Sequence, residues 1–165
     1  MSVKASFFQT ERSDWFFVIS ATLVFVFALF VTAWDFIVIQ KMFFRFGTVN
    51  AAGLILFSIG VVIRLVGKRT LGKYYSYGLR TLPNHKLIKH GIYRYVRHPI
   101  SLAAIIYSIG IPLFLSSLYG FFIMLGLIPL IPYRIGIEEK MLIEKLGDEY
   151  REYVKKTKKL LPFIY

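Results

Sequence analysis

The sequence predicts an all-α integral membrane protein of about four transmembrane helices, with a helical hairpin and a C-terminal interfacial helix. Hydrophobic residues make up 56% of the 165 positions, and they form blocks longer than a helix or strand of a soluble core requires. The 21 Lys and Arg residues lie mostly between these blocks, as in basic loops that meet anionic lipid headgroups. The net charge of +12 therefore does not indicate nucleic-acid binding, since no basic recognition helix stands apart from the apolar blocks.

The first predicted span is the uncharged run 15–34, long enough as a helix to cross a hydrocarbon core of roughly 30 Å. Asp14 and Asp35 bracket it, and Trp15 and Trp34 occupy positions typical of an interfacial aromatic belt. A cleaved signal peptide is disfavoured, because the run is too long and no small-residue cleavage pattern follows it.

The second span is predicted at 48–66. Gly53 and Gly60 give this segment small surfaces for close helix packing. Arg64 lies near its end, where we expect the side chain to snorkel to the interface.

The third and fourth spans are predicted at 99–115 and 118–133. Only a few residues around Ser116 separate them, so we expect the two helices to form a tight hairpin. Pro129 and Pro132 predict a bend in the second of these helices, because proline removes a helical hydrogen bond.

The distribution of basic residues predicts the orientation. Eight Lys and Arg lie from Lys68 to Arg97 and eight from Arg134 to Lys159, against two in the loop after the first span. We therefore expect both termini to face the cytoplasm. The cytoplasmic side would also hold the loop 67–98 and the tail 134–165, within a single membrane-embedded domain that covers 1–165.

The two ends of the hairpin are expected to meet at the cytoplasmic interface. His98 and Arg134 are equally distant in sequence from residue 116, so antiparallel helices of equal length would return them to the same depth. This places the adjacent carboxylates of Glu138 and Glu139 beside the segment that ends at His98. Such a pair next to a span is costly unless it is solvated or meets a cation, and the residues alone leave both alternatives open.

His98 and Pro99 read as a helix start, with proline at the first helical position. The N–H groups at that end would form a binding site for an anion such as a carboxylate. The chain has no cysteine, and His85, His90 and His98 lack a recognised metal-ligand spacing. We therefore expect no metal site.

The chain resembles the isoprenylcysteine carboxyl methyltransferase family and its phospholipid methyltransferase relatives over roughly residues 71–163. The resemblance rests on the order and spacing of five pieces: Leu71-Gly-Lys-Tyr-Tyr75, His85-Lys-Leu-Ile-Lys-His-Gly-Ile-Tyr93, Arg97-His-Pro99, Arg134-Ile-Gly-Ile-Glu-Glu139 and Leu146-Gly-Asp-Glu-Tyr-Arg-Glu-Tyr153. Where the family usually has Tyr and Gly after its Arg-His-Pro motif, this chain has Ser101 and Ala103.

The resemblance implies a methyltransferase that uses S-adenosylmethionine in a cytoplasm-facing pocket. It implies catalytic roles for Arg134 and Glu138, and substrate binding by Arg134, with Arg97 as a second candidate. The residues expected to contact the cofactor are His85, Lys86, Leu87, Ile88, Tyr93, His98, Pro99, Ile100, Ser101, Glu138 and Glu139.

The residue types suit this chemistry. A glutamate can pair with the ammonium of the cofactor, and methyl transfer to a carboxylate needs alignment and exclusion of water, not a strong base. The acceptor implied is an isoprenylcysteine-like or other lipophilic molecule in the membrane, without an obligate protein partner. A phospholipid or amine N-methyltransferase, an NADPH-dependent sterol-type reductase and a non-catalytic membrane protein stay open as alternatives.

The tail predicts a short helix after a break at Gly147. Leu146, Tyr150, Tyr153 and Val154 share one face, with acidic residues early and lysines late, as the helix dipole favours. The helix either lies in the interface as an ordinary amphipathic element or closes over the pocket.

Overall fold

The computed structural model describes residues 2–40, 46–72 and 87–160, and these are almost entirely helical. The elements are α1 (Ser2–Asp35), the π-helical turn η1 (Phe36–Gln40), α2 (Thr48–Leu71), the 3-10 turn η3 (Gly91–Arg94), α3 (Pro99–Phe114), α4 (Leu118–Leu127), α5 (Leu130–Leu146) and α6 (Asp148–Lys156). Within the described ranges the extended contact is a single isolated bridge between Val96 and Lys158. The predicted all-α class is confirmed.

Three helical stretches are long and apolar enough to cross a membrane: Val18–Ile39, Thr48–Leu71 and Leu118–Leu146. The remaining predicted span is present as α3, whose 16 residues fall short of the roughly 20 that a complete crossing requires. Large apolar side chains such as Phe16, Phe27 and Phe30 are exposed along α1, as expected for a surface that contacts lipid. The chain is therefore an integral membrane protein.

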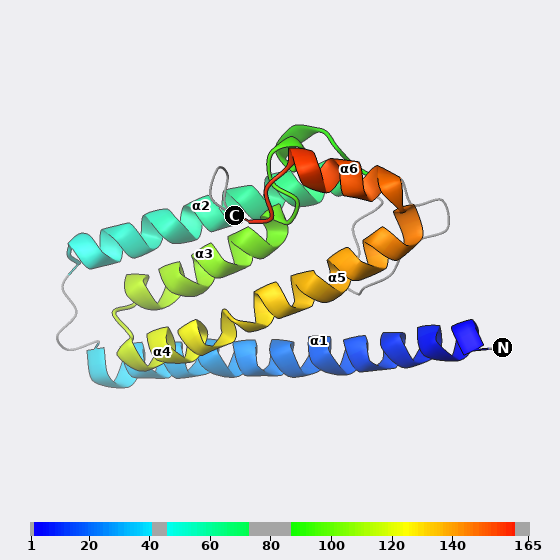
Figure 1. Cartoon of the computed structure of the whole chain (residues 1–165). Helices are drawn as coiled ribbons and strands as arrows, with labels where there is room; N and C mark the ends of the chain where they lie inside the picture. Colours follow the sequence, from blue (N-terminus) through cyan, green and yellow to red (C-terminus); the bar gives the residue numbers. More distant parts are fainter. Residues whose placement is uncertain (1, 41–45, 73–86, 161–165) are drawn as a thin grey trace.

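Glycines let α2 and α3 approach each other closely (Figure 1). A Cβ added at Gly60 would lie 3.1 Å from the carbonyl oxygen of Ala103, and one at Gly110 would lie 2.6 Å from the backbone nitrogen of Phe57. The predicted packing role of Gly60 is thus confirmed. Arg64 lies at the contact between α2 and α3, where it donates a hydrogen bond to the Tyr107 hydroxyl at 3.2 Å. Its guanidinium is therefore directed into the bundle.

Polar side chains of α1 and α2 form hydrogen bonds with the hairpin between α3 and α4. Asn50 Nδ2, at the start of α2, donates to the carbonyl oxygen of Phe114 at 2.8 Å and to Ser116 Oγ at 2.7 Å. Ser117 Oγ donates to Asp35 Oδ2 at 2.6 Å, and this carboxylate is buried. Asp35, expected at the interface, therefore joins the end of α1 to the hairpin tip.

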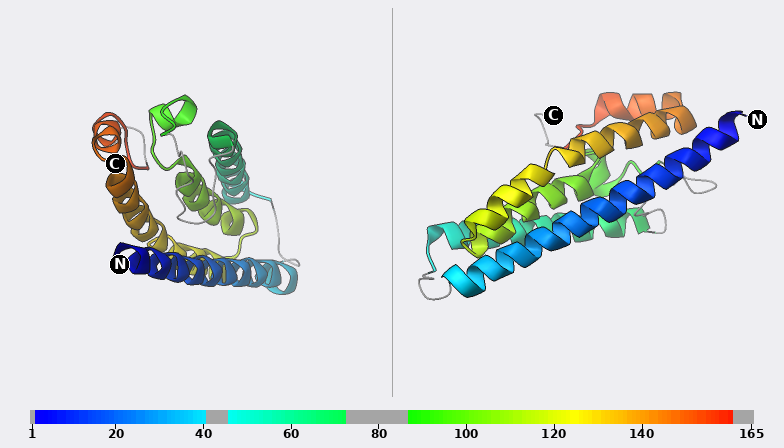
Figure 2. Two further views of the ribbon diagram at one scale, coloured as in Figure 1. Left: turned by 90° about the vertical axis from the view of Figure 1, so that its right-hand side faces the viewer. Right: turned by 90° about the horizontal axis from the view of Figure 1, so that it is seen from below.

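The helices are arranged so that α3 lies between α2 and α5, while α4 runs along α1 (Figure 2). The predicted bend occurs at Pro129, between the end of α4 at Leu127 and the start of α5 at Leu130. The predicted break at Gly147 is also present, with φ of 56°, and α6 folds back from it toward the start of α3 (Figure 1). This end of the bundle collects the charged residues of the candidate site.

Candidate active site

The start of α3 supplies the first half of the site. The 3-10 turn η3 brings the chain to His98, which precedes Pro99 at the first helical position. The predicted helix start is therefore confirmed. Leu102 N–H bonds to the His98 carbonyl oxygen at 3.0 Å, whereas helix geometry leaves the N–H groups of Ile100 and Ser101 without an intrahelical acceptor.

Glu139 on α5 is surrounded by cationic groups of the chain itself. Arg97 Nε donates to Glu139 Oε1 at 2.9 Å, His98 Nε2 lies 3.3 Å from the same oxygen, and Lys159 Nζ lies 3.3 Å from Oε2. The side chains of Arg97 and Glu139 are 8% and 14% exposed. A charge this deeply placed is tolerated because opposite charges and hydrogen bonds compensate for lost hydration.

Glu138 has a different environment from its neighbour. Its Oε2 lies 3.6 Å from His98 Nδ1, and its side chain is 40% exposed. His98 thus has one ring nitrogen toward each of the two carboxylates. Because Glu139 is already engaged by several cations, Glu138 is the carboxylate of the pair that is more accessible to a cationic ligand.

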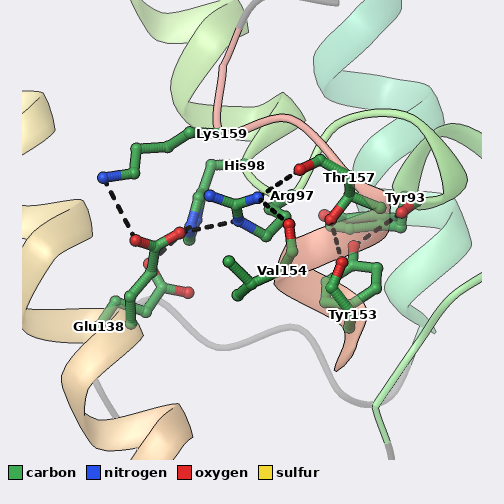
Figure 3. Close-up of polar contacts among 9 residues, drawn as sticks. Tyr93, Arg97, His98, Glu138, Tyr153, Val154, Thr157 and Lys159 are labelled. Carbon is green, nitrogen blue, oxygen red and sulfur yellow. Dashed lines mark hydrogen bonds and ion pairs between the residues drawn. The ribbon is translucent and has the colours of Figure 1, made fainter. Parts of the chain in front are cut away.

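The segment 157–160, which we call the C-terminal strap, pairs with the loop before α3. Lys158 N–H bonds to the Tyr95 carbonyl oxygen at 3.0 Å, and Arg97 N–H bonds to that of Lys158 at 2.8 Å. The Arg97 Nη1 also donates to the carbonyl oxygens of Val154 and Thr157 (Figure 3). Arg97 therefore joins α6 and the strap to Glu139 on α5.

Two tyrosines of α6, Tyr150 and Tyr153, are buried. The Tyr153 hydroxyl donates to the Tyr93 carbonyl oxygen at 2.7 Å, and burial raises the pKa of Tyr153 to about 12, so the donor keeps its proton. The ring of Tyr150 lies 5.9 Å from that of Tyr153, centroid to centroid. Tyr150 is 1% exposed, and its hydroxyl has no hydrogen-bond partner among the described residues.

A match over more than half of the chain identifies the family. The model of the isoprenylcysteine carboxyl methyltransferase (ICMT) family matches residues 53–144, more than half of the sequence. The chain belongs to the ICMT family. That range includes both α3, with its preceding loop, and the glutamate pair of α5.

Individual relatives agree with this assignment. A probable protein-S-isoprenylcysteine O-methyltransferase of Oryza sativa subsp. indica is 36% identical over 119 residues, which cover 70% of this chain and 62% of the relative. The enzyme named protein-S-isoprenylcysteine O-methyltransferase in Saccharomyces cerevisiae is 33% identical, over 68% of this chain and 48% of its own length. The chain thus spans about half to two thirds of the length of these relatives.

A solved structure supports the fold. The eukaryotic intramembrane Ras methyltransferase ICMT superposes with a TM-score of 0.74 at 26% identity, and the match covers 84% of this chain and 52% of that one. The helical arrangement of an ICMT family member is therefore shared by most of this chain.

Several residues predicted for the site of this ICMT family member lie together at one end of the bundle. Contacts join Arg97 and His98 to Glu138 and Glu139, as expected from the hairpin. Arg134 lies on α5 one helical turn before Glu138. The other described candidates flank this cluster in the loop and first turn of α3: Leu87, Ile88, Tyr93, Pro99, Ile100 and Ser101. His85 and Lys86 lie outside the described residues.

The sequence alone does not predict that Lys159 pairs with Glu139. Its distance from Glu139 in the chain gives no local signal, and only the strap brings the two together. The burial of Tyr150 and Tyr153 was signalled by their shared helix face. Among the described residues, no group of three or more His, Asp or Glu side chains is arranged to hold a metal ion.

Proposed function

We propose that the chain is an S-adenosylmethionine-dependent methyltransferase that methylates the carboxylate of an isoprenylcysteine-like molecule in the membrane. The observation that carries the proposal is the placement of the accessible Glu138 carboxylate beside the start of α3. The Glu138 side of this site favours a cation, and the start of α3 favours an anion. The site lies at the end of an apolar helical bundle. Membership of the ICMT family and the names of the relatives support the same reaction.

The described residues fit the cofactor. Glu138 would hold its ammonium, and the N–H groups of Ile100 and Ser101 would face its carboxylate. Tyr150 adds a buried hydroxyl that has no hydrogen-bond partner among the described residues. S-adenosylmethionine, when bound, supplies an electrophilic methyl group on a sulfonium. The donor set therefore suits a ligand that has both a cationic and an anionic end.

We propose that Arg134 binds the carboxylate of the methyl acceptor. A guanidinium holds a carboxylate with two parallel hydrogen bonds, and Arg134 projects from the same region of α5 as Glu138. Arg97 is nearly buried and bonds to Glu139 and to carbonyl oxygens of α6 and the strap. We therefore propose that Arg97 positions the site and that it is not a direct substrate ligand.

A carboxylate acceptor requires little further chemistry from the chain. It is already a nucleophile at neutral pH, so the residues need only align it with the methyl group and exclude water. The apolar helices would keep the isoprenoid tail in the membrane, and the charged cluster would receive the polar end at the cytoplasmic surface. An amine acceptor would instead need a base to remove its proton.

The test is transfer of a labelled methyl group from S-adenosylmethionine in membranes that contain the protein. Acceptors would be N-acetyl-S-farnesylcysteine, its carboxamide and phosphatidylethanolamine. We expect label only in the farnesylcysteine, as a methyl ester that alkali releases. Label in phosphatidylethanolamine would identify an N-methyltransferase, and no transfer to any acceptor would contradict the methyltransferase proposal.

A further inference from the structure

Tyr150 has a hydroxyl whose burial the fold does not explain. The side chain is 1% exposed and the hydroxyl has no hydrogen-bond partner among the described residues. Buried polar groups in proteins are almost always paired, because an unpaired donor loses its bonds to water without replacement. A phenylalanine would fill the same space without this cost. The hydroxyl therefore needs a hydrogen-bond acceptor that the described part of the chain does not supply.

Tyr153, the other buried tyrosine of α6, does have a hydrogen-bond acceptor for its hydroxyl. It lies on the same buried face of α6, and the two rings are in contact at 5.9 Å. Its hydroxyl, however, is fully accounted for as a donor, since it bonds to the Tyr93 carbonyl oxygen at 2.7 Å. The helix thus buries two similar tyrosines, and within the described part of the chain one hydroxyl has a partner and the other has none.

The surroundings of Tyr150 place it at the candidate site. The preceding residue, Glu149, pairs with Lys89 at 2.7 Å, beside the predicted cofactor residues Leu87 and Ile88. The following turn of α6 holds Tyr153 against Tyr93. Burial, and after it the negative charges of Glu139 and Glu138, raise the pKa of Tyr150 well above its ordinary value. The hydroxyl therefore keeps its proton and acts as a donor.

We infer that the Tyr150 hydroxyl donates a hydrogen bond to the carboxylate of a bound ligand. This inference rests on the proposed function, which supplies two ligands with a carboxylate: the amino-acid end of the cofactor and the methyl acceptor. A carboxylate is the strongest common acceptor for a phenol, and the cations Arg97, His98 and Lys159 near the glutamate pair moderate the negative charge of the region. Tyr150 is then a ligand-binding residue that the fold keeps unpaired until the site is filled.

The test compares Tyr150→Phe with Tyr153→Phe as the matched control, in full-length purified protein. Without ligand, Tyr150→Phe should melt at the same temperature as the wild type or higher, because no bond is lost. Tyr153→Phe should melt lower, because it loses the bond to Tyr93. A large fall in the melting temperature of Tyr150→Phe, or failure of that variant to fold, would show that its hydroxyl has a structural partner and would overturn the inference.

Ligand affinity identifies the carboxylate. The first pair of probes is S-adenosylhomocysteine and its decarboxylated analogue, which keeps the ammonium. The second is N-acetyl-S-farnesylcysteine and its carboxamide. Tyr150→Phe should weaken binding of the carboxylate member of one pair by about tenfold, while binding of the other member of that pair changes little. The pair affected shows which ligand supplies the carboxylate.

Equal affinities in the wild type and Tyr150→Phe for all four probes would overturn the inference and would indicate a buried water as the partner. Equal weakening of both members of a pair would also overturn it, since the contact would not be to a carboxylate. A wild-type protein that binds neither S-adenosylhomocysteine nor the farnesylcysteine would instead contradict the proposed function itself.

Discussion

The adjacent glutamates of α5 have different surroundings, and from this difference we expect different roles. Glu139 is 14% exposed and is engaged by Arg97, His98 and Lys159, whereas Glu138 is 40% exposed and approaches only His98 among the ion pairs described. Removal of charge at Glu138 should therefore affect a ligand more than the fold. Removal of charge at Glu139 should do the reverse.

The first prediction concerns Glu138→Gln, which keeps the shape of the side chain and removes its charge. We expect S-adenosylmethionine to bind more weakly by roughly 1.5–3 kcal/mol, the usual contribution of a hydrogen bond to a charged group. Isothermal titration with purified protein measures the change, and the melting temperature without ligand should stay near that of the wild type. Unchanged affinity in the folded variant would remove Glu138 from the cofactor site.

The second prediction concerns Arg134→Lys. Lysine keeps the positive charge but does not reproduce the two parallel hydrogen bonds of a guanidinium to a carboxylate. We expect methyl transfer to farnesylcysteine to fall strongly, with S-adenosylmethionine affinity nearly intact. Rates should be measured with the acceptor near saturation and well below it. Full activity under both conditions would show that Arg134 only reaches lipid headgroups, and would favour an amine or neutral acceptor.

At the scale of elements, the C-terminal strap depends on the Arg97–Glu139 pair. Arg97 connects Glu139 on α5 to the carbonyl oxygens of Val154 in α6 and of Thr157 in the strap. If Glu139 loses its charge, the nearly buried guanidinium loses its compensating partner. The strap and the loop before α3 should then separate more readily.

The third prediction is that Glu139→Gln lowers the free energy of unfolding by about 3 kcal/mol, because it breaks a largely buried ion pair. The exposed Lys158 should also become more susceptible to trypsin. Thermal unfolding and limited proteolysis measure the two effects, with Glu138→Gln as the matched control. Equal proteolysis of the two variants would indicate that Glu139 does not hold the strap.

Sequence patterns predicted these elements better than the contacts between them. Uncharged runs predicted the spans, and local backbone chemistry predicted the start of α3 at Pro99 and the break at Gly147. The partners of Asp35 and Glu139 had no such signal. Ser117 and Lys159 reach them only after distant helices pack, so the pairing depends on tertiary geometry and not on local propensity.

At the scale of the whole molecule, the charged residues and the fold indicate the same candidate functional end. The glutamate pair, the start of α3 and α6 lie at the end opposite the α3–α4 hairpin (Figure 1). In the sequence, eight basic residues lie from Lys68 to Arg97 and eight from Arg134 to Lys159, and those that the structure describes belong to the same end. By the positive-inside rule we expect this end to face the cytoplasm.

The fourth prediction tests this orientation with single cysteines, which is possible because the natural chain has none. Cysteines placed at Lys4, Lys89 and Lys158 should react with an impermeant maleimide only after the membrane is permeabilised, whereas one at Gly47 should react in intact cells. Gly47 is exposed at the start of α2, on the side with few basic residues. Reaction of Lys89→Cys or Lys158→Cys in intact cells would place the site outside, away from a cytoplasmic supply of S-adenosylmethionine. The orientation would then contradict the proposed reaction as well as the charge rule.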